Sequence, residues 1–289
     1  MGWDWFLRLW CAAWGAVALV GAVRSLAGVT KAQRTVRLTG RIRAVGVPRH
    51  GASRIGGIPL EVSYRDPDSG REVVVTDDEG RGETVAAAWA GREIGVCHPR
   101  GRPHEFGFAD APQPPSRGLA GPAAALFAAY AGLVALAALH RGWPWALVGG
   151  AGPWALSGLW HLPGAVRDRR GRRERLAAMD AVPGRIVAVF RDVRTDEESG
   201  SVLTTRTPVV AFTTRDGTAV TAHCTAHLAD PARARGREVT VHHTPANPAE
   251  FTLDPAADRR SWAWDVAVHV AAVVVLAATA AVGAVLLLR

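Results

Sequence analysis

The residues with the clearest capacity for chemistry are histidines and one cysteine in the last third of the chain. His223, Cys224 and His227 fall within five positions, and His242 and His243 follow. Imidazole and thiolate groups are the ligands that zinc prefers, and an H-x3-H spacing puts both rings on one face of a helix. One hypothesis is therefore a metal-binding sensor that uses His223, Cys224, His227 and His243.

A repeated stretch weakens that hypothesis. GREIGVCHPRGRPHEF begins at Gly91, GREVTVHHTPANPAEF begins at Gly236, and only His98 and His243 recur between them. In a strand that covers the second stretch, alternation places His243 on the same face as two valines. We therefore expect His98 and His243 to fill structural core positions, and we predict no bound cofactor.

Ionisable side chains also occur inside apolar segments. Asp265 and His269 lie four residues apart, on one face of a helix, and His161 lies at a similar depth in another segment. Ionisable groups at membrane depth are candidates for function. Two interpretations stay open for His161, Asp265 and His269: a proton or ion relay in a small transporter, or a polar contact that positions two helices.

A dense basic run follows the third apolar segment. Its members are Arg167, Arg169, Arg170, Arg172, Arg173 and Arg175. Each arginine near a bilayer surface attracts anionic headgroups by about 1 kcal/mol. The polar regions lack the interleaved basic and aromatic residues of single-strand or RNA platforms. We therefore expect the run to contact lipid and expect no nucleic-acid partner.

The motifs of common enzymes are missing. No phosphate-cradling glycine loop, G-x-S-x-G or H-E-x-x-H sequence occurs. The repeated Arg92-Glu93 and Arg237-Glu238 pairs resemble a grip for a carboxylate or phosphate, but solvated strand-entry pairs are the commoner case. We expect a non-enzymatic protein.

The elements that must position these residues are four apolar segments and two polar regions in 289 residues, 48% of which are hydrophobic. A bilayer-spanning helix needs about 20 apolar residues. We expect transmembrane helices within residues 1–28, 118–140, 145–166 and 262–288. The polar regions are residues 29–117 and 167–261, the latter including the basic run.

Orientation follows from the arginines, because basic residues favour the cytoplasmic side. They cluster after the first and third segments and before the fourth, whereas the turn at 140–145 carries only Arg141. This predicts both termini outside and both polar regions cytoplasmic. Asp4 and Arg8 give the first segment no basic leader, so we expect it to be retained rather than cleaved.

The two polar regions match in order. Gly40–Val45 matches Gly184–Val189, Ile58–Tyr64 matches Thr207–Thr213, and each region ends on the repeated stretch described above. The intervening runs are short, β-branched and bounded by Gly, Pro and Asp turns. We expect a duplicated antiparallel β domain, either a strongly bent sheet or a partly open barrel.

At these positions the chain resembles a bacterial membrane family known as domain of unknown function 3592. In the second region the resemblance rests on Gly184, Ile186, Pro208–Phe212, Asp216, Gly217, Gly236, Val239, Val241, His243, Pro245 and Pro248. The first region keeps Gly40, Ile42, Pro59, Val62, Gly91, Ile94, Val96 and Pro103. The resemblance implies two copies of the domain and its flanking helices, and no activity.

Together these observations predict an α+β integral membrane protein of the inner membrane, with four transmembrane helices carrying two small antiparallel β domains. Its predicted role is non-enzymatic: a binding, scaffold or sensor module at the cytoplasmic face. The partners we expect are the bilayer, anionic lipid headgroups and a protein whose identity the sequence leaves open.

Overall fold

The computed structural model describes residues 2–67, 69–77, 84–196, 200–224, 228 and 230–289, and within these the side chains of 261–263, 265 and 266 are not described. The chain divides into two compact units. The helical unit comprises Met1–Gln33, Ser116–Glu174 and Ala257–Arg289. The β unit comprises Arg34–Pro115 and Arg175–Ala256, so both polar regions belong to one unit.

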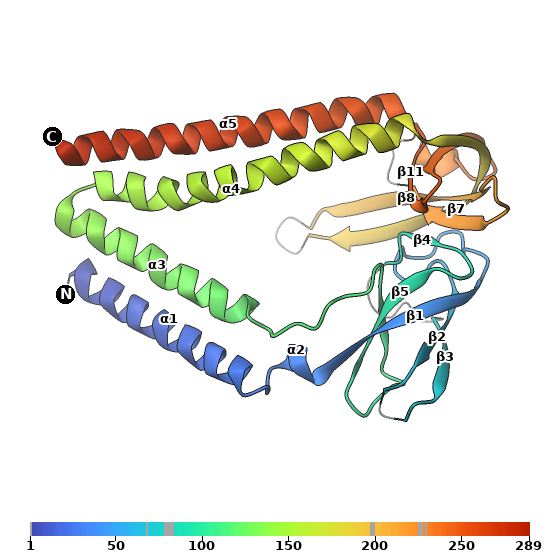
Figure 1. Ribbon diagram of the computed structural model, residues 1–289, viewed down its shortest axis with the longest axis horizontal. Coiled ribbons are helices and arrows are strands. Elements are labelled where there is room, and N and C mark those ends of the chain that lie inside the picture. Colours follow the sequence, from blue (N-terminus) through green and yellow to red (C-terminus); the bar gives the residue numbers. More distant parts are fainter. Residues whose placement is uncertain (1, 68, 78–83, 197–199, 225–227, 229) are drawn as a thin grey trace. The chain divides into compact units, whose positions relative to one another are not determined.

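The long helices are α1 (Trp3–Leu26), α3 (Ala120–Arg141), α4 (Pro144–Ala177) and α5 (Pro255–Leu288), and α2 (Lys31–Arg34) is a single turn. Figure 1 shows α1 beside α3 and α4 beside α5. Trp10 donates from Nε1 to the carbonyl of Ala128 (3.0 Å), and Ser25 donates to that of Arg117 (2.9 Å). These two contacts make α1 and α3 antiparallel.

Glycines allow the helices to approach closely. A Cβ at Gly158 would lie 2.5 Å from Cγ2 of Val273, and one at Gly149 would lie 2.7 Å from Cγ2 of Val134. Close packing at small residues is the usual way in which helices associate in a bilayer, where lipid tails remove the hydrophobic driving force. α4 therefore packs between α3 and α5.

Among the described residues, three helices are long and apolar enough to cross a membrane: Trp3–Arg34, Ala120–Arg141 and Ala267–Leu288. The fourth predicted span, 145–166, is helical and long enough, but it is less apolar than these three helices. Its glycines, Pro153 and His161 dilute the apolar residues. α4 also continues to Ala177, so the basic run lies on a helix, since arginine and glutamate are good helix formers.

The β unit contains two antiparallel sheets. The first has the order β3-β2-β1-β5-β6 and is built from β1 (Thr35–Val45), β2 (Leu60–Arg65), β3 (Glu72–Thr76), β5 (Glu93–Pro99) and β6 (Gly107–Ala109). The second has the order β11-β10-β7-β8-β9-β4. Its strands are β7 (Asp180–Thr195), β8 (Val202–Thr213), β9 (Ala219–His223), β10 (Glu238–Thr244), β11 (Asn247–Thr252) and β4 (Ala87–Ala88).

The second sheet is a nearly closed barrel, because its edge strands β11 and β4 touch. β4 comes from the first polar region and pairs with β9 through Ala87 opposite Ala222. Without β4, the remaining five strands repeat the order of the first sheet. The sequence left a strongly bent sheet and a partly open barrel as alternatives, and the second sheet is the one that forms a nearly closed barrel.

Each sheet has a β-bulge at the same place. The register shifts between Ile42 and Ala44 in β1, and between Ile186 and Ala188 in β7. A bulge adds one residue to a strand and increases its twist and bend. It therefore explains how sheets this short curve around a core.

The sequence match between β2 and β8 was wrong by one residue. Ile42 lies opposite Val62, and Ile186 lies opposite Val210, so Val62 corresponds to Val210 rather than to Ala211. A slip of one residue moves every side chain to the other face of a strand. The Pro59 match to Pro208 misled the alignment, because Pro208 takes the place of Leu60.

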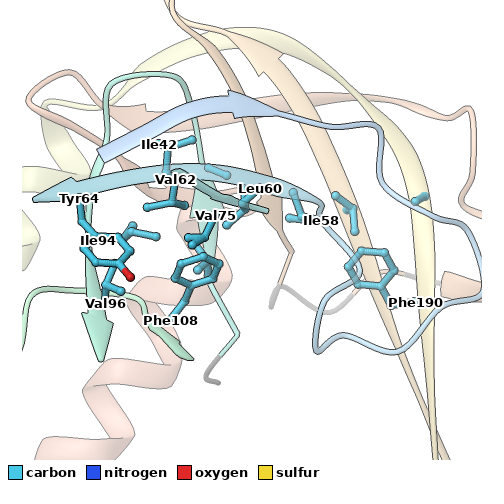
Figure 2. Packing of buried hydrophobic residues seen from close by; sticks show 14 residues of the cluster. Ile42, Ile58, Leu60, Val62, Tyr64, Val75, Ile94, Val96, Phe108 and Phe190 are labelled. Atoms are coloured by element: carbon cyan, nitrogen blue, oxygen red, sulfur yellow. The ribbon is translucent and has the colours of Figure 1, made fainter. Parts of the chain in front are cut away.

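The two polar regions share their hydrophobic cores. One cluster joins Ile58 and Leu60 of the first region to Phe190 and Val209 of the second, and Figure 2 shows Phe190 beside Ile58. A Cβ at Gly57 would lie 2.4 Å from Cζ of Phe190. The predicted β domains thus pack as one body.

Two equivalent grooves and the predicted site residues

The recurring histidines lie in the core, as strand alternation predicts. His98 and His243 are each 2% exposed. Nδ1 of His98 donates to the Pro99 carbonyl (2.9 Å), and Nδ1 of His243 donates to that of Thr244 (3.3 Å). Both Nε2 atoms are buried without a hydrogen-bond partner among the described residues. Each ring also packs on an aromatic ring, Tyr64 or Phe212.

The structure describes three of the four candidate metal ligands. His223 is buried and meets Phe190 edge-on with centroids 5.2 Å apart, whereas His243 packs on Phe212. Cys224 is buried in the barrel core. The fourth candidate, His227, lies outside the described residues. Within the described part of the chain, no three His, Cys, Asp or Glu residues are grouped to hold a metal ion.

Burial controls the protonation of His223. Desolvation, followed by the charge of Arg54, lowers the pKa of His223 from 6.5 to about 4. A buried imidazole loses the hydration that stabilises its charged form. His223 is therefore neutral at physiological pH.

The polar residues of α4 and α5 lie at one level. Gly158 meets Val273, and Gly283 meets Leu147, which fixes the antiparallel register and places His161 level with His269. His161 is exposed, and the buried Nε2 of His269 has no hydrogen-bond partner among the described residues. Asp265 lies on α5, but its side chain is outside the description.

The basic run occupies the last turns of α4. Arg169 is half-buried, and Arg167, Arg170, Arg172, Arg173 and Arg175 are exposed. Nε of Arg175 lies 3.1 Å from the carboxylate of Glu250. One arginine of the run therefore ties the end of α4 to the barrel strand β11.

A polar groove of about 410 Å³ lies on the first sheet and is called groove 1. Its side chains come from four neighbouring strands and include Thr39, Arg41, Ser63, Arg65, Glu72 and Glu93. Arg41 lies opposite Glu93 across β1 and β5. Nε of Arg41 donates to the carbonyl of Gly91 at 3.2 Å, which anchors the guanidinium beside the groove.

A groove of about 490 Å³ lies at the equivalent place on the second sheet and is called groove 2. The six positions that correspond are Pro183, Arg185, Ala211, Thr213, Ala219 and Glu238. Arg185 lies opposite Glu238 and donates from Nε to the carbonyl of Gly236 at 3.3 Å. The Arg–Glu pair and its glycine anchor therefore recur in both grooves.

The two grooves differ in the rest of their lining. Groove 1 adds Ser63, Arg65 and Glu72, where groove 2 has Ala211, Thr213 and Ala219. Hydrogen bonds from Arg43 and Ser63, followed by the Arg43 charge, lower the pKa of Glu72. Groove 1 is thus the more highly charged, and groove 2 offers small apolar and hydroxyl groups beside an arginine and a glutamate that face each other across the strands in the same way.

The repeated Arg-Glu dipeptides were only partly understood from sequence. Arg237 is exposed, as expected. Arg92 is not a solvated residue: its side chain is 11% exposed, pairs with Asp110 at 3.1 Å, donates to the Ala87 carbonyl and stacks on Trp89. Each glutamate lies opposite an arginine of the neighbouring strand, Glu93 opposite Arg41 and Glu238 opposite Arg185. The recurring Gly-Arg of Gly40-Arg41 and Gly184-Arg185 was the available signal.

Comparison with known families agrees with the second region of the chain. Residues 182–258 match the family described as Domain of unknown function (DUF3592), and no second copy is shown in the first region. No curated protein and no solved structure matches the chain. The matched segment contains all of groove 2 and the buried His243. Residues 182–258 therefore form a DUF3592 domain, in a chain whose described part contains three candidate membrane helices.

Proposed function

We propose that this protein is a non-enzymatic binding module, held at the membrane, that presents two related grooves to a protein partner. The observation that carries the proposal is the recurrence of one Arg–Glu pair, with one glycine anchor, on both sheets. Paired charges of both signs suit a peptide segment, whose side chains and backbone offer donors and acceptors.

A photo-crosslinking experiment tests this function. A photoreactive amino acid replaces Ser63 in groove 1 or Ala211 in groove 2, and exposed Arg100 or Arg235 in the controls. We expect both grooves to capture the same partner in cells and Arg41→Gln with Arg185→Gln to abolish capture. Equal capture from the control positions, or unchanged capture by the double variant, would rule out the grooves as the binding surface.

The first polar region is, in this proposal, a diverged copy of the DUF3592 domain. The common strand order, the common bulge and the paired buried histidines support it. In both regions the backbone of an isoleucine also bonds the repeated turn: Gly91 N donates to Ile42 O, and Gly236 N donates to Ile186 O. Divergence of the groove lining explains why two copies are kept.

A four-span topology with both β regions in the cytoplasm completes the proposal. β4 pairs with β9, so the two polar regions share one side of the membrane. α3 crosses once between them, and α4 has to cross back despite its weaker apolar character. The arginines flanking these helices favour the cytoplasm for that side.

Cysteine accessibility tests the topology. A cysteine placed at Gly142, in the turn between α3 and α4, should react with an impermeant reagent added to intact cells. Cys97 and Cys224 should react only after the membrane and the fold are opened. A turn cysteine that is protected in cells and exposed in inverted vesicles would reverse the orientation.

A second candidate, ion handling, rests on Nε2 of His269, which is buried without a hydrogen-bond partner among the described side chains and is level with His161. Replacement of His269 by Ala would then abolish proton flux in reconstituted vesicles while leaving insertion intact. Replacement of half-buried Thr279 on the same helix is the control. Flux that survives in the His269 variant would leave a purely positioning role.

A further inference from the structure

A third groove, distinct from grooves 1 and 2, lies where the loop before β2 meets the β7–β8 hairpin. Its volume is about 480 Å³, and it is called the arginine groove. Three of its lining residues are Arg54, Arg191 and Arg194, and the apolar ones include Val193 and Leu203. A volume of this size suits a small molecule or a lipid headgroup.

Hydrogen bonds hold the loop before β2 on one side of the groove. Asp192 accepts hydrogen bonds from Ser53 Oγ (2.6 Å) and from the Arg54 backbone N–H (3.1 Å). Burial alone would raise the pKa of Asp192, but these bonds and the charges of Arg54 and Arg194 hold the pKa below its usual value. Gly51 N also donates to the Val189 carbonyl at 2.9 Å. The loop is thus fixed along β7, and Asp192 is already occupied in holding it.

The three arginines are exposed at the surface of the arginine groove. Among the described residues, none of the three arginines has an ion-pair partner. Three cations and one anion leave the described lining with a net positive charge. Arginine is the side chain best suited to grip phosphate oxygens, through two parallel N–H donors.

Apolar residues beside these charges indicate which class of anion the groove fits. Ile55 and Val193 are each 52% exposed, and Leu203 is 65% exposed. A free phosphate would leave them in water, whereas the acyl region of a lipid would cover them. We propose that the arginine groove binds the phosphate of an anionic phospholipid, with the adjoining apolar residues against the lipid's glycerol and acyl part.

A local reporter tests this without interference from the basic run on α4. An environment-sensitive fluorescent amino acid replaces exposed Thr195, next to Arg194, in full-length protein held in phosphatidylcholine nanodiscs. Dihexanoylphosphatidylglycerol is then titrated in, and dihexanoylphosphatidylcholine, inorganic phosphate and polyglutamate are titrated separately. We expect a saturable change with the anionic lipid alone.

Charge removal provides the matched comparison. Arg191→Gln with Arg194→Gln should weaken anionic-lipid binding by about tenfold or more, since two charge-assisted contacts are lost. Arg235→Gln with Arg237→Gln removes the same charge from exposed sites elsewhere and should change binding by less than about twofold. Protease resistance of the β unit confirms that both variants fold.

Four results would overturn the proposal. They are unchanged binding by the Arg191 and Arg194 variant, equal binding of the neutral lipid, phosphate binding as tight as lipid binding, and displacement of the lipid by polyglutamate. The third would assign the groove to free phosphate and the fourth to an acidic peptide.

Discussion

The two sheets share one pattern and differ in how they close. Strand order, bulge, buried histidine and glycine anchor are the same in both. In the second sheet the outer edge, β9, is covered by β4 from the first region, and the sheet becomes a nearly closed barrel. The first sheet ends at the corresponding strand, β3. A repeated sequence therefore gave a repeated topology but different closure.

The hydrophobic cores of the two regions also differ at equivalent positions. Phe190 lies two residues beyond Ala188, where the bulge of β7 ends, and is fully buried in the cluster it shares with the first region. At the corresponding place after β1 the first region has Gly46, whose backbone packs against Pro59. The second region thus supplies a ring to the first, and the first supplies a strand to the second.

The largest expected effect comes from removing that ring. Phe190→Ala should lower the free energy of unfolding by about 3–5 kcal/mol, because a buried aromatic leaves a cavity. Hydrogen–deuterium exchange should show lost protection in β2 of the first region as well as in β7. Val193→Ala, on the same strand but exposed, should change stability by about 0.5 kcal/mol or less. Full protection of β2 in the Phe190 variant would contradict a shared core.

The next effect depends on pH. The pKa of His223 is about 4 in the folded chain and about 6.5 when unfolded, so between these values only the unfolded state binds the proton. The contribution of neutral His223 to the free energy of unfolding is fully present above pH 6.5. It should fall by about 3 kcal/mol as the pH drops to 4. The corresponding position of the first sheet is exposed Thr76.

The dependence of stability on pH is measured as the urea midpoint of the full-length protein at several pH values. Protease resistance of the β unit reports unfolding. His223→Gln should flatten this dependence, whereas His104→Gln at an exposed site should not. An unchanged pH dependence in the His223 variant would mean that other groups cause the acid sensitivity.

Removal of the arginine from the repeated Arg-Glu dipeptide should lower stability more in the first region than in the second. Arg92→Ala should cost about 2 kcal/mol, because it removes the hydrogen bonds to the carbonyls of Ala87 and Asp110 and the ion pair with the Asp110 carboxylate, and so loosens β4. Arg237→Ala, at the equivalent exposed position, should cost about 0.5 kcal/mol or less. The same urea midpoints compare them, and equal losses would contradict the asymmetric role of the first region.

The smallest effects should be equal in the two copies. Gly91 and Gly236 have φ values of 92° and 84°, which side-chain-bearing residues rarely adopt. Gly91→Ala and Gly236→Ala should each cost about 1 kcal/mol. A large effect at one position and none at the other would show that the two turns are not equivalent.

Local patterns were sufficient for much of this fold. The β-branched runs with their turn residues located the strands, and the twenty-residue apolar segments located the helices. The core positions of His98 and His243 followed from alternation along a strand. The β2–β8 match failed because a proline was used as the guide, although register is set by the opposing strand.

The candidate sites were harder to predict, because each depends on residues that are distant in sequence. Grooves 1 and 2 bring together four strands, and the arginine groove joins Arg54 to Arg191 across the two regions. Two of the candidate metal ligands, His223 and His243, pack on different aromatic rings, Phe190 and Phe212. Spacing along a strand says little about which side chains meet across a sheet.

The sequence by itself determined the apolar helices, the two β regions and their internal repetition, because these follow from the periodicity and turn chemistry of neighbouring residues. Only the tertiary structure decided that a two-residue strand, β4, would complete the sheet of the other region, and that Phe190 would fill the first region's core. Both features are favourable because β4 pairs the edge of β9 and Phe190 fills core volume. Which strand edge is paired and which volume is filled depends on the folded chain as a whole.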